Sequence, residues 1–184
     1  PKTLWIATVP VIVATCLAWS LIATFDPTIA LIALAASVLM QIVTNLQNDV
    51  GFTERRTGTG VHLGLPRATA SGWLTRRAVK QAIAATIVIA GLATLPLMLR
   101  GGWPIVLIGA VSTLAAYGYM GGPRPIAYTP LGELTVFVFF GLTAVCGTYY
   151  LQAGEIGVAA WIAGAAIGSH AAAVLLVNNY RDRA

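Results

Sequence analysis

Six long apolar runs constrain the fold of this chain more than any other feature of its sequence. The runs cover approximately residues 4–25, 28–45 or slightly beyond, 78–99, 104–120, 131–152 and 157–177. An α-helix needs about 20 mostly apolar residues to cross the hydrocarbon core of a bilayer. In lipid, only helices and closed barrels satisfy the backbone, and barrel strands would alternate apolar and polar residues. The sequence therefore predicts an all-α, polytopic transmembrane bundle of about six helices.

The composition supports a lipid bilayer as the solvent of this chain. Hydrophobic residues make up 58% of its 184 residues and charged residues only 9%, whereas a soluble domain carries about 25% charged residues. We therefore expect a single transmembrane domain over residues 1–184. Its net charge of +5 is attributed to cytoplasmic loops and anionic lipid, and no nucleic-acid partner is expected.

The distribution of basic residues predicts the orientation of the bundle. Six helices place the N-terminus, the connections near residues 50–77 and 121–130, and the C-terminus on one side. Ten of the 11 Lys and Arg residues belong to that side, and only Arg100 belongs to the other. Because cytoplasmic loops are enriched in Lys and Arg, we expect a multi-pass protein of the inner (plasma) membrane. Its N-terminus and polar connections would then face the cytoplasm.

Two polar motifs with the same spacing give the strongest functional signal. Asn45 and Asp49 are four residues apart near the end of the second predicted helix. Asn178 and Asp182 are also four residues apart, at the end of the sixth. Residues with this spacing share one helical face, and the two helices run in the same direction. We therefore expect the two faces to meet across a shared cavity.

The chemistry of these faces favours a site for Mg²⁺ and a diphosphate. Mg²⁺ takes oxygen ligands and is typically held by one or two carboxylates together with substrate phosphates. Arginine side chains close by would bind the phosphate oxygens. Polar residues that only contact water at helix ends are one alternative, and a small transporter or channel subunit is another.

Three other features predict local structure. Gly164 and Gly168 are expected to let two helices approach closely. Pro96 is expected to kink the third predicted helix near its end. Glu133 begins the fifth predicted helix, where an acidic side chain interacts favourably with the helix dipole.

Several stretches of the sequence resemble the UbiA superfamily of membrane prenyltransferases. They are NLQNDVG at residues 45–51, TER at 53–55, GLPRAT at 64–69, GPRPIAYTPLGE at 122–133, FFG at 139–141 and NNYRD at 178–182. The resemblance is strongest to the branch that prenylates 1,4-dihydroxy-2-naphthoate in menaquinone synthesis. It implies a fold of about nine helices, of which the six predicted here are a part, and hence a domain that is incomplete at its C-terminus.

The resemblance also implies an activity and a set of site residues. The activity is Mg²⁺-dependent transfer of a polyprenyl group from its diphosphate to an aromatic acceptor. Asp49 and Asp182 are the implied catalytic residues. The implied metal ligands are Asn45, Asp49, Asn178 and Asp182. The implied substrate-binding residues are Asn45, Asn48, Arg67, Tyr119, Arg124, Asn178 and Arg181.

Departures from the family pattern motivate a second hypothesis. Phe52 and Gly58 stand where the first motif usually continues with further aspartates, and the sequence stops at Ala184 before the second motif is complete. A catalytically impaired or truncated family member, which binds prenyl diphosphate only weakly, is therefore the alternative to an active prenyltransferase.

Overall fold

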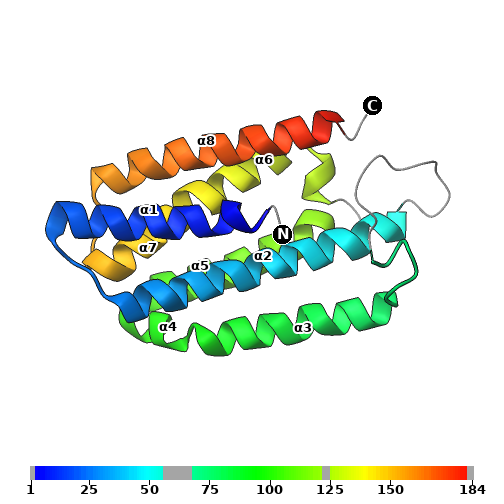
Figure 1. Cartoon of the computed structure of the whole chain (residues 1–184), viewed down its shortest axis with the longest axis horizontal. Coiled ribbons are helices and arrows are strands. Elements are labelled where there is room, and N and C mark those ends of the chain that lie inside the picture. The colour runs from blue at the N-terminus through cyan, green and yellow to red at the C-terminus, as the bar shows by residue number, and fades with distance from the viewer. Residues whose placement is uncertain (1–2, 56–67, 122–124, 182–184) are drawn as a thin grey trace.

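The computed structural model of the chain describes residues 3–55, 68–121 and 125–181, and within these ranges every regular element is a helix. The all-α prediction is therefore confirmed, and Figure 1 shows the helices packed side by side as a bundle. The elements are α1 Leu4–Ile22, α2 Pro27–Arg55, α3 Arg76–Ala93, α4 Leu95–Gly101, α5 Trp103–Met120, the 3₁₀ turn η1 Ile126–Tyr128, α6 Leu131–Val136, the π-helical segment η2 Phe137–Thr143, α7 Ala144–Ala153 and α8 Val158–Arg181.

The number of membrane spans agrees with the six apolar runs. Within the described ranges, five helical segments are long and apolar enough to cross a bilayer, and α3 with α4 gives a sixth if the bent pair counts as one span. This pair is bent by 45°, and Pro96 lies at the start of α4, where a helix tolerates proline because no intrahelical N–H is lost. The expected kink near Pro96 is confirmed.

Helix α2 is longer than the apolar run from which it was predicted. The run ends near Asn45, whereas α2 continues through polar residues to Arg55. The extension contains no proline, and Glu54 within it forms an ion pair with Lys80 of α3 at 2.7 Å. Hydropathy follows only the apolar run, so it missed the polar continuation of α2, in which Gln47, Val50 and Thr53 are buried. As a result, Asn45 and Asp49 lie inside α2 and not at its end.

The fifth span changes its helical geometry midway, at the π-helical segment η2. Here Gly141 packs directly against α8, because a Cβ atom on Gly141 would lie 2.5 Å from Cα of Gly168 and would also clash with the carbonyl oxygen of Gly164. The close approach predicted for Gly164 and Gly168 is therefore confirmed. Nothing in the sequence reasoning predicted the π segment that presents Gly141 to them.

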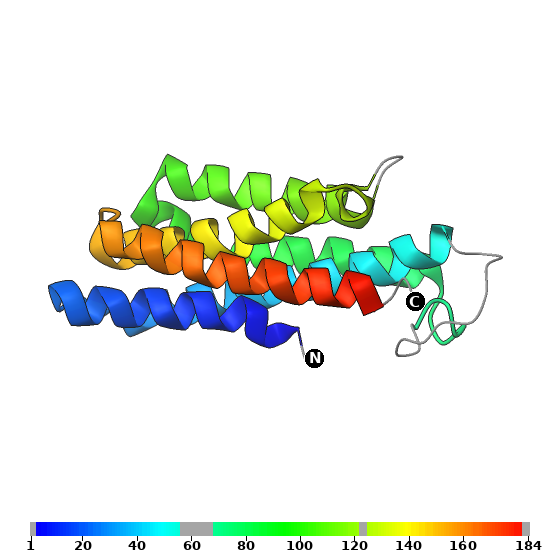
Figure 2. The same cartoon turned by 90° about the horizontal axis from the view of Figure 1, so that it is seen from above.

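The two ends of the bundle differ in their connections, as Figures 1 and 2 show. At one end lie the last turn of α2, the first turn of α3 and the last turn of α8, and we call this the loop end. At the opposite end lie the short turns at residues 23–26 and 154–157 together with α4, and we call this the turn end. The predicted polar segments thus belong to the loop end.

Hydrogen bonds tie the turns together at the turn end. Gln152 is only 2% exposed, and its side chain accepts from the Asp26 N–H at 2.8 Å and donates to the Asp26 carbonyl at 3.0 Å. Arg100 donates from Nε to the Leu151 carbonyl at 2.7 Å, and its guanidinium lies 3.8 Å from the Asp26 carboxylate. These contacts join three connections that are far apart in the sequence.

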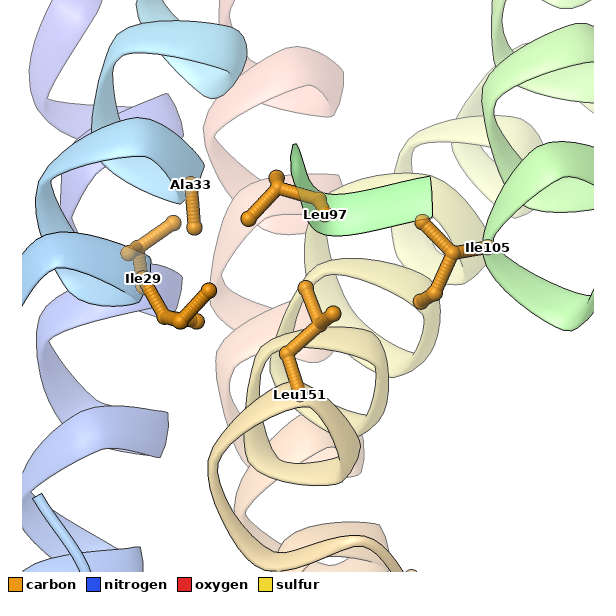
Figure 3. Close-up of a cluster of buried hydrophobic side chains, with 6 residues drawn as sticks. Ile29, Ala33, Leu97, Ile105 and Leu151 are labelled. Atoms are coloured by element: carbon orange, nitrogen blue, oxygen red, sulfur yellow. The ribbon is translucent and has the colours of Figure 1, made fainter. Parts of the chain in front are cut away.

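A buried hydrophobic cluster lies beside these turns. Figure 3 shows the labelled side chains converging from α2, α4, α5 and α7. The cluster consists of Val11, Ile29, Ala33, Leu97, Ile105 and Leu151. It forms the closed, apolar end of the interior space described next.

Candidate functional site

The interior of the bundle contains a cavity of about 850 Å³. Five residues of the hydrophobic cluster line it toward the turn end: Val11, Ala33, Leu97, Ile105 and Leu151. Most of the remaining wall is apolar side chains from α2, α3, α5, η2 and α8. The cavity therefore combines a long apolar interior with a short polar region, which lies toward the loop end.

Four of the predicted site residues form part of that polar region. Asn45 and Asn48 of α2, Tyr119 of α5 and Asn178 of α8 all line the cavity. Asn45 and Asn178 belong to the two motifs that were expected to face each other, and they are 133 positions apart in the chain. The structure thus brings one asparagine of each motif to the same cavity, while the roles of these residues stay predictions.

The other predicted site residues do not line the cavity in the described part of the chain. Arg67, Arg124 and Asp182 lie outside the described residues. Arg181 is the last residue of α8, and its side chain also lies outside the described part. Asp49 is described, but it is held beside the cavity by the segment that leads into α3.

Two threonines fix the position of Asp49. The Asp49 carboxylate accepts from the backbone N–H of Thr69 through Oδ2 at 3.2 Å. The Asp49 carbonyl accepts from the Thr53 hydroxyl at 3.0 Å and the Thr69 hydroxyl at 3.1 Å, and these hydroxyls are 2.7 Å apart. The other carboxylate oxygen, Oδ1, is buried and has no hydrogen-bond partner among the described residues. A buried acceptor in this state is stabilised by any ligand that offers positive charge or a donor.

Asn45 is held by two residues that the sequence reasoning did not select. The Thr3 hydroxyl donates to Oδ1 of Asn45 at 3.3 Å and accepts from Nδ2 of Asn45 at 3.2 Å. Gln41, which is 5% exposed, donates from Nε2 to Oδ1 of Asn45 at 3.3 Å. The one available sequence signal was the four-residue spacing of Gln41 and Asn45, which places both on one face of α2.

A further polar contact anchors the end of α8. Asn179 donates from Nδ2 to the Glu133 carboxylate at 3.0 Å. Glu133 lies in the first turn of α6, so the position expected from the helix dipole is confirmed. No pattern in the sequence indicated that Glu133 would also bind Asn179, the neighbour of Asn178, and so connect α8 to α6.

The oxygen donors at the loop end fit a Mg²⁺ ion that is shared with a phosphate ligand. No group of three or more His, Cys, Asp or Glu side chains suited to a metal occurs among the described residues. Asp49 supplies one carboxylate with an unpaired oxygen and Asn178 an amide oxygen, whereas Oδ1 of Asn45 already accepts from Thr3 and Gln41. Mg²⁺ is commonly bound by one or two carboxylates, and substrate phosphates supply the remaining ligands. These residues therefore suit Mg²⁺ only when a phosphate ligand is bound beside them.

Comparison with known proteins decides the family. Residues 7–184 match the UbiA prenyltransferase family. The chain belongs to this family. It is 38% identical over 188 residues to the 1,4-dihydroxy-2-naphthoate octaprenyltransferase of Escherichia coli (strain K12), in an alignment that covers 99% of this chain and 61% of the relative. The proteins of the same name from Mycobacterium tuberculosis (strain ATCC 25618 / H37Rv) and Bacillus subtilis (strain 168) are 36% and 31% identical.

The chain is shorter than these relatives. Matches to the same two proteins cover 99% of this chain but only 62% and 58% of the relatives, so this UbiA-family chain spans about six tenths of the length of the curated relatives it matches. No solved structure matches the chain. Together with the apolar helices, the family identifies a multi-pass membrane protein.

Proposed function

We propose that this UbiA-family protein transfers a polyprenyl group from its diphosphate to 1,4-dihydroxy-2-naphthoate, in menaquinone biosynthesis and with Mg²⁺. The observation that carries the proposal is the cavity, which is apolar along most of its wall and lined by Asn45, Asn48 and Asn178 at the loop end. The names of the curated relatives supply the acceptor and the polyprenyl donor.

The distribution of apolar and polar residues along the cavity suits a lipid diphosphate in one orientation only. Burial of apolar surface contributes about 25 cal/mol per Å², so a polyprenyl tail is stabilised against Leu97, Ile105 and Leu151. A diphosphate loses its hydration if it enters such a region, at a large cost. The diphosphate would therefore remain at the amides of the loop end while the tail extends toward the turn end.

The residues of the loop end have complementary tasks in the transfer. The amide N–H groups of Asn45, Asn48 and Asn178 would donate to diphosphate oxygens, and the oxygen of Asp49 that lacks a partner would hold the metal ion. Bound Mg²⁺ supplies positive charge that stabilises the leaving diphosphate. When the carbon–oxygen bond breaks, its electrons leave with the diphosphate, and the aromatic ring attacks the allylic cation. The ring then loses a proton or CO2, which restores its aromaticity. Apolar walls exclude the water that would otherwise capture this cation.

We also propose that the loop end faces the cytoplasm across the inner membrane. Among the described basic residues, Arg100 lies at the turn end, and the other five lie in α2, α3 and α8 near the loop end: Arg55, Arg76, Arg77, Lys80 and Arg181. Such an asymmetry is typical of cytoplasmic loops. A cytoplasmic loop end would admit water-soluble 1,4-dihydroxy-2-naphthoate and Mg²⁺ to the polar region of the cavity.

An assay in isolated membranes tests the proposed function. Membranes that contain the protein, octaprenyl diphosphate and 1,4-dihydroxy-2-naphthoate should form the prenylated naphthalene product, and chelation of Mg²⁺ should abolish its formation. Membranes with the Escherichia coli relative serve as the positive control. The absence of product beside an active control would contradict the proposal.

The same assay addresses the impaired-enzyme alternative, which Phe52 motivates. Phe52→Asp restores a carboxylate where the family's first motif usually has one, so it should increase product formation if the rest of the site is intact. Trp73→Asp is the matched control for added negative charge, since Trp73 is 70% exposed and lies outside the cavity lining. Equal effects of the two substitutions would speak against a metal-binding role for position 52.

A further inference from the structure

Helix α2 carries a line of polar side chains from the loop end into the apolar part of the cavity. The line consists of Ser37, Gln41, Thr44, Asn45 and Asn48, all of which line the cavity. Ser37 already donates its hydroxyl to the Ala7 carbonyl at 2.6 Å, and Thr44 donates to the Met40 carbonyl at 3.0 Å. These two hydroxyls are satisfied by the protein itself and need no ligand.

Gln41 differs from both of these residues. Its side chain makes a long hydrogen bond, 3.3 Å from Nε2 to Oδ1 of Asn45, compared with the usual 2.9–3.0 Å. Its carbonyl oxygen Oε1 is buried and has no hydrogen-bond partner among the described residues. An unpaired buried acceptor destabilises a fold, and inside a membrane such a polar group marks a functional site by default.

The direction of hydrogen bonding leaves the carbonyl oxygen of Gln41 as the free group. Oδ1 of Asn45 accepts from Nε2 of Gln41 and from the Thr3 hydroxyl, and Nδ2 of Asn45 donates to Thr3. Gln41 therefore uses its donor on Asn45 and leaves Oε1 without a partner among the described residues. The last torsion of a glutamine side chain is soft. Rotation about it can present Oε1 to a ligand in the cavity that carries an O–H or N–H group.

The place of Gln41 along α2 matches the place of the aromatic acceptor. Gln41 lies one helical turn from Asn45 on the side away from the loop end, a rise of about 6 Å. The ring must attack the carbon that bears the diphosphate, so it has to lie within one turn of the diphosphate site. Asp49 is two turns away from Gln41, a rise of about 12 Å, which separates Gln41 from the carboxylate that would hold the metal.

We infer that Gln41 binds the aromatic acceptor, with Oε1 accepting a hydrogen bond from a ring hydroxyl. The inference rests on the proposed function. In 1,4-dihydroxy-2-naphthoate the 1-hydroxyl is adjacent to the carboxylate and donates to it within the molecule. The 4-hydroxyl is the free donor, so it is the group that Gln41 recognises. The diphosphate cannot take this place, because its oxygens are acceptors and would repel Oε1.

A binding experiment with two ligands tests the inference. The purified protein is titrated anaerobically with 1,4-dihydroxy-2-naphthoate and with 1-hydroxy-2-naphthoate, which lacks the 4-hydroxyl, and naphthalene fluorescence gives each Kd. The wild-type protein should bind the dihydroxy ligand about tenfold more tightly, as expected for one hydrogen bond to an otherwise unpaired group. Gln41→Leu, which has similar size and no polar atom, should bind both ligands with equal affinity.

Thr3→Val is the matched control, because it also removes a partner of Asn45 but leaves Oε1 of Gln41 in place. It should retain the tenfold preference for the dihydroxy ligand. If Gln41→Leu does not fold, as judged by thermal unfolding, Gln41→Met replaces it. A preference that survives in the Gln41 variant, or one that is absent from the wild type, overturns the inference.

The experiment separates this inference from the proposed function. Binding of both ligands by the wild type without any preference leaves the proposed function intact and refutes the role of Gln41. If the wild type binds neither ligand and forms no product, both fail together. If Gln41→Leu raises the Mg²⁺ concentration needed for activity but leaves the ligand preference unchanged, Gln41 acts on the metal site and the inference is wrong.

Discussion

Gln41 and Gln152 are both buried glutamines; Gln41 lines the cavity, and Gln152 lies at the turn end of the bundle. Gln152, at the turn end, uses both atoms of its amide on the backbone of Asp26. Gln41, toward the loop end, uses only Nε2, and its Oε1 has no partner among the described residues. A satisfied amide holds chain segments together, whereas an unsatisfied one is available to a ligand. The turn end is thus built for stability and the loop end for binding.

Substitutions of two aspartates, one at each end, are expected to show the largest difference between the loop end and the turn end. Asp49→Asn removes the carboxylate of the loop end and should lower prenyl transfer about 10³-fold, the size of effect seen when a group that stabilises charge is removed from an active site. At the turn end, the Asp26 carboxylate caps α2 by accepting from the N–H groups of Thr28 and Ile29. Asp26→Asn should change the rate less than about twofold, because Asn caps a helix as well as Asp does. Product formation in membranes measures both rates.

The Asp26 substitution is also expected to leave stability nearly unchanged. The contact between Asp26 and Arg100 is 3.8 Å long and its side chains are partly exposed, so it contributes less than about 1 kcal/mol. Comparable losses of activity in Asp49→Asn and Asp26→Asn would remove the functional distinction between the two ends.

Substitutions of the two glutamines are expected to have the next largest effect, which is a change in the free energy of unfolding. Gln152→Leu leaves the N–H and the carbonyl of Asp26 without their partners, so it should lower the free energy of unfolding by about 2 kcal/mol. That corresponds to a Tm lower by roughly 4–8 °C. Gln41→Leu removes an acceptor that has no partner, so its Tm should stay the same or rise. Thermal unfolding in detergent measures both; equal destabilisation would break the comparison.

The apolar end of the cavity should control the length of the prenyl chain. Ala33→Leu enlarges a side chain that lines the cavity there and points toward Leu97 (Figure 3). The variant should use octaprenyl diphosphate about tenfold less well relative to geranylgeranyl diphosphate, which is the scale for small changes in a hydrophobic pocket. Ratios of kcat/KM for the two donors measure this. An unchanged ratio would mean that the tail does not reach Ala33.

The smallest effect is expected for the ion pair at the loop end. Lys80 and Glu54 are 2.7 Å apart, but their side chains are 59% and 40% exposed. Lys80→Met should therefore change the free energy of unfolding by less than about 1 kcal/mol, and the difference should vanish at high salt. A larger effect would show that ion pairs, and not buried amides, distinguish the two ends.

The sequence predicted the helices well because hydropathy reports directly on lipid burial. Six apolar runs gave the spans, and the four-residue spacing of Asn45 from Asp49 placed both on one face of α2. The sequence failed where structure depends on contacts. The extension of α2 to Arg55 is a polar stretch that pairs with α3 through Glu54, and the π segment at Phe137–Thr143 packs on α8.

The candidate site was predictable only in part, for the same reason. Asn45, Asn48, Tyr119 and Asn178 were selected, and all four line the cavity. Gln41 was not selected, because residue type and spacing do not tell whether a buried amide has partners. That property depends on Thr3 and Asn45, which the fold brings together. Thr69 was likewise missed as the residue that fixes Asp49.

The most direct test of the account is an experimental structure of the protein with Mg²⁺ and a polyprenyl thiodiphosphate that resists hydrolysis. The account predicts phosphate oxygens within hydrogen-bond distance of Asn45 and Asn178, a metal ion on Asp49, and a tail that reaches Leu97 and Ile105. A diphosphate bound at the turn end beside Arg100, or a tail that lies outside the cavity, would contradict it.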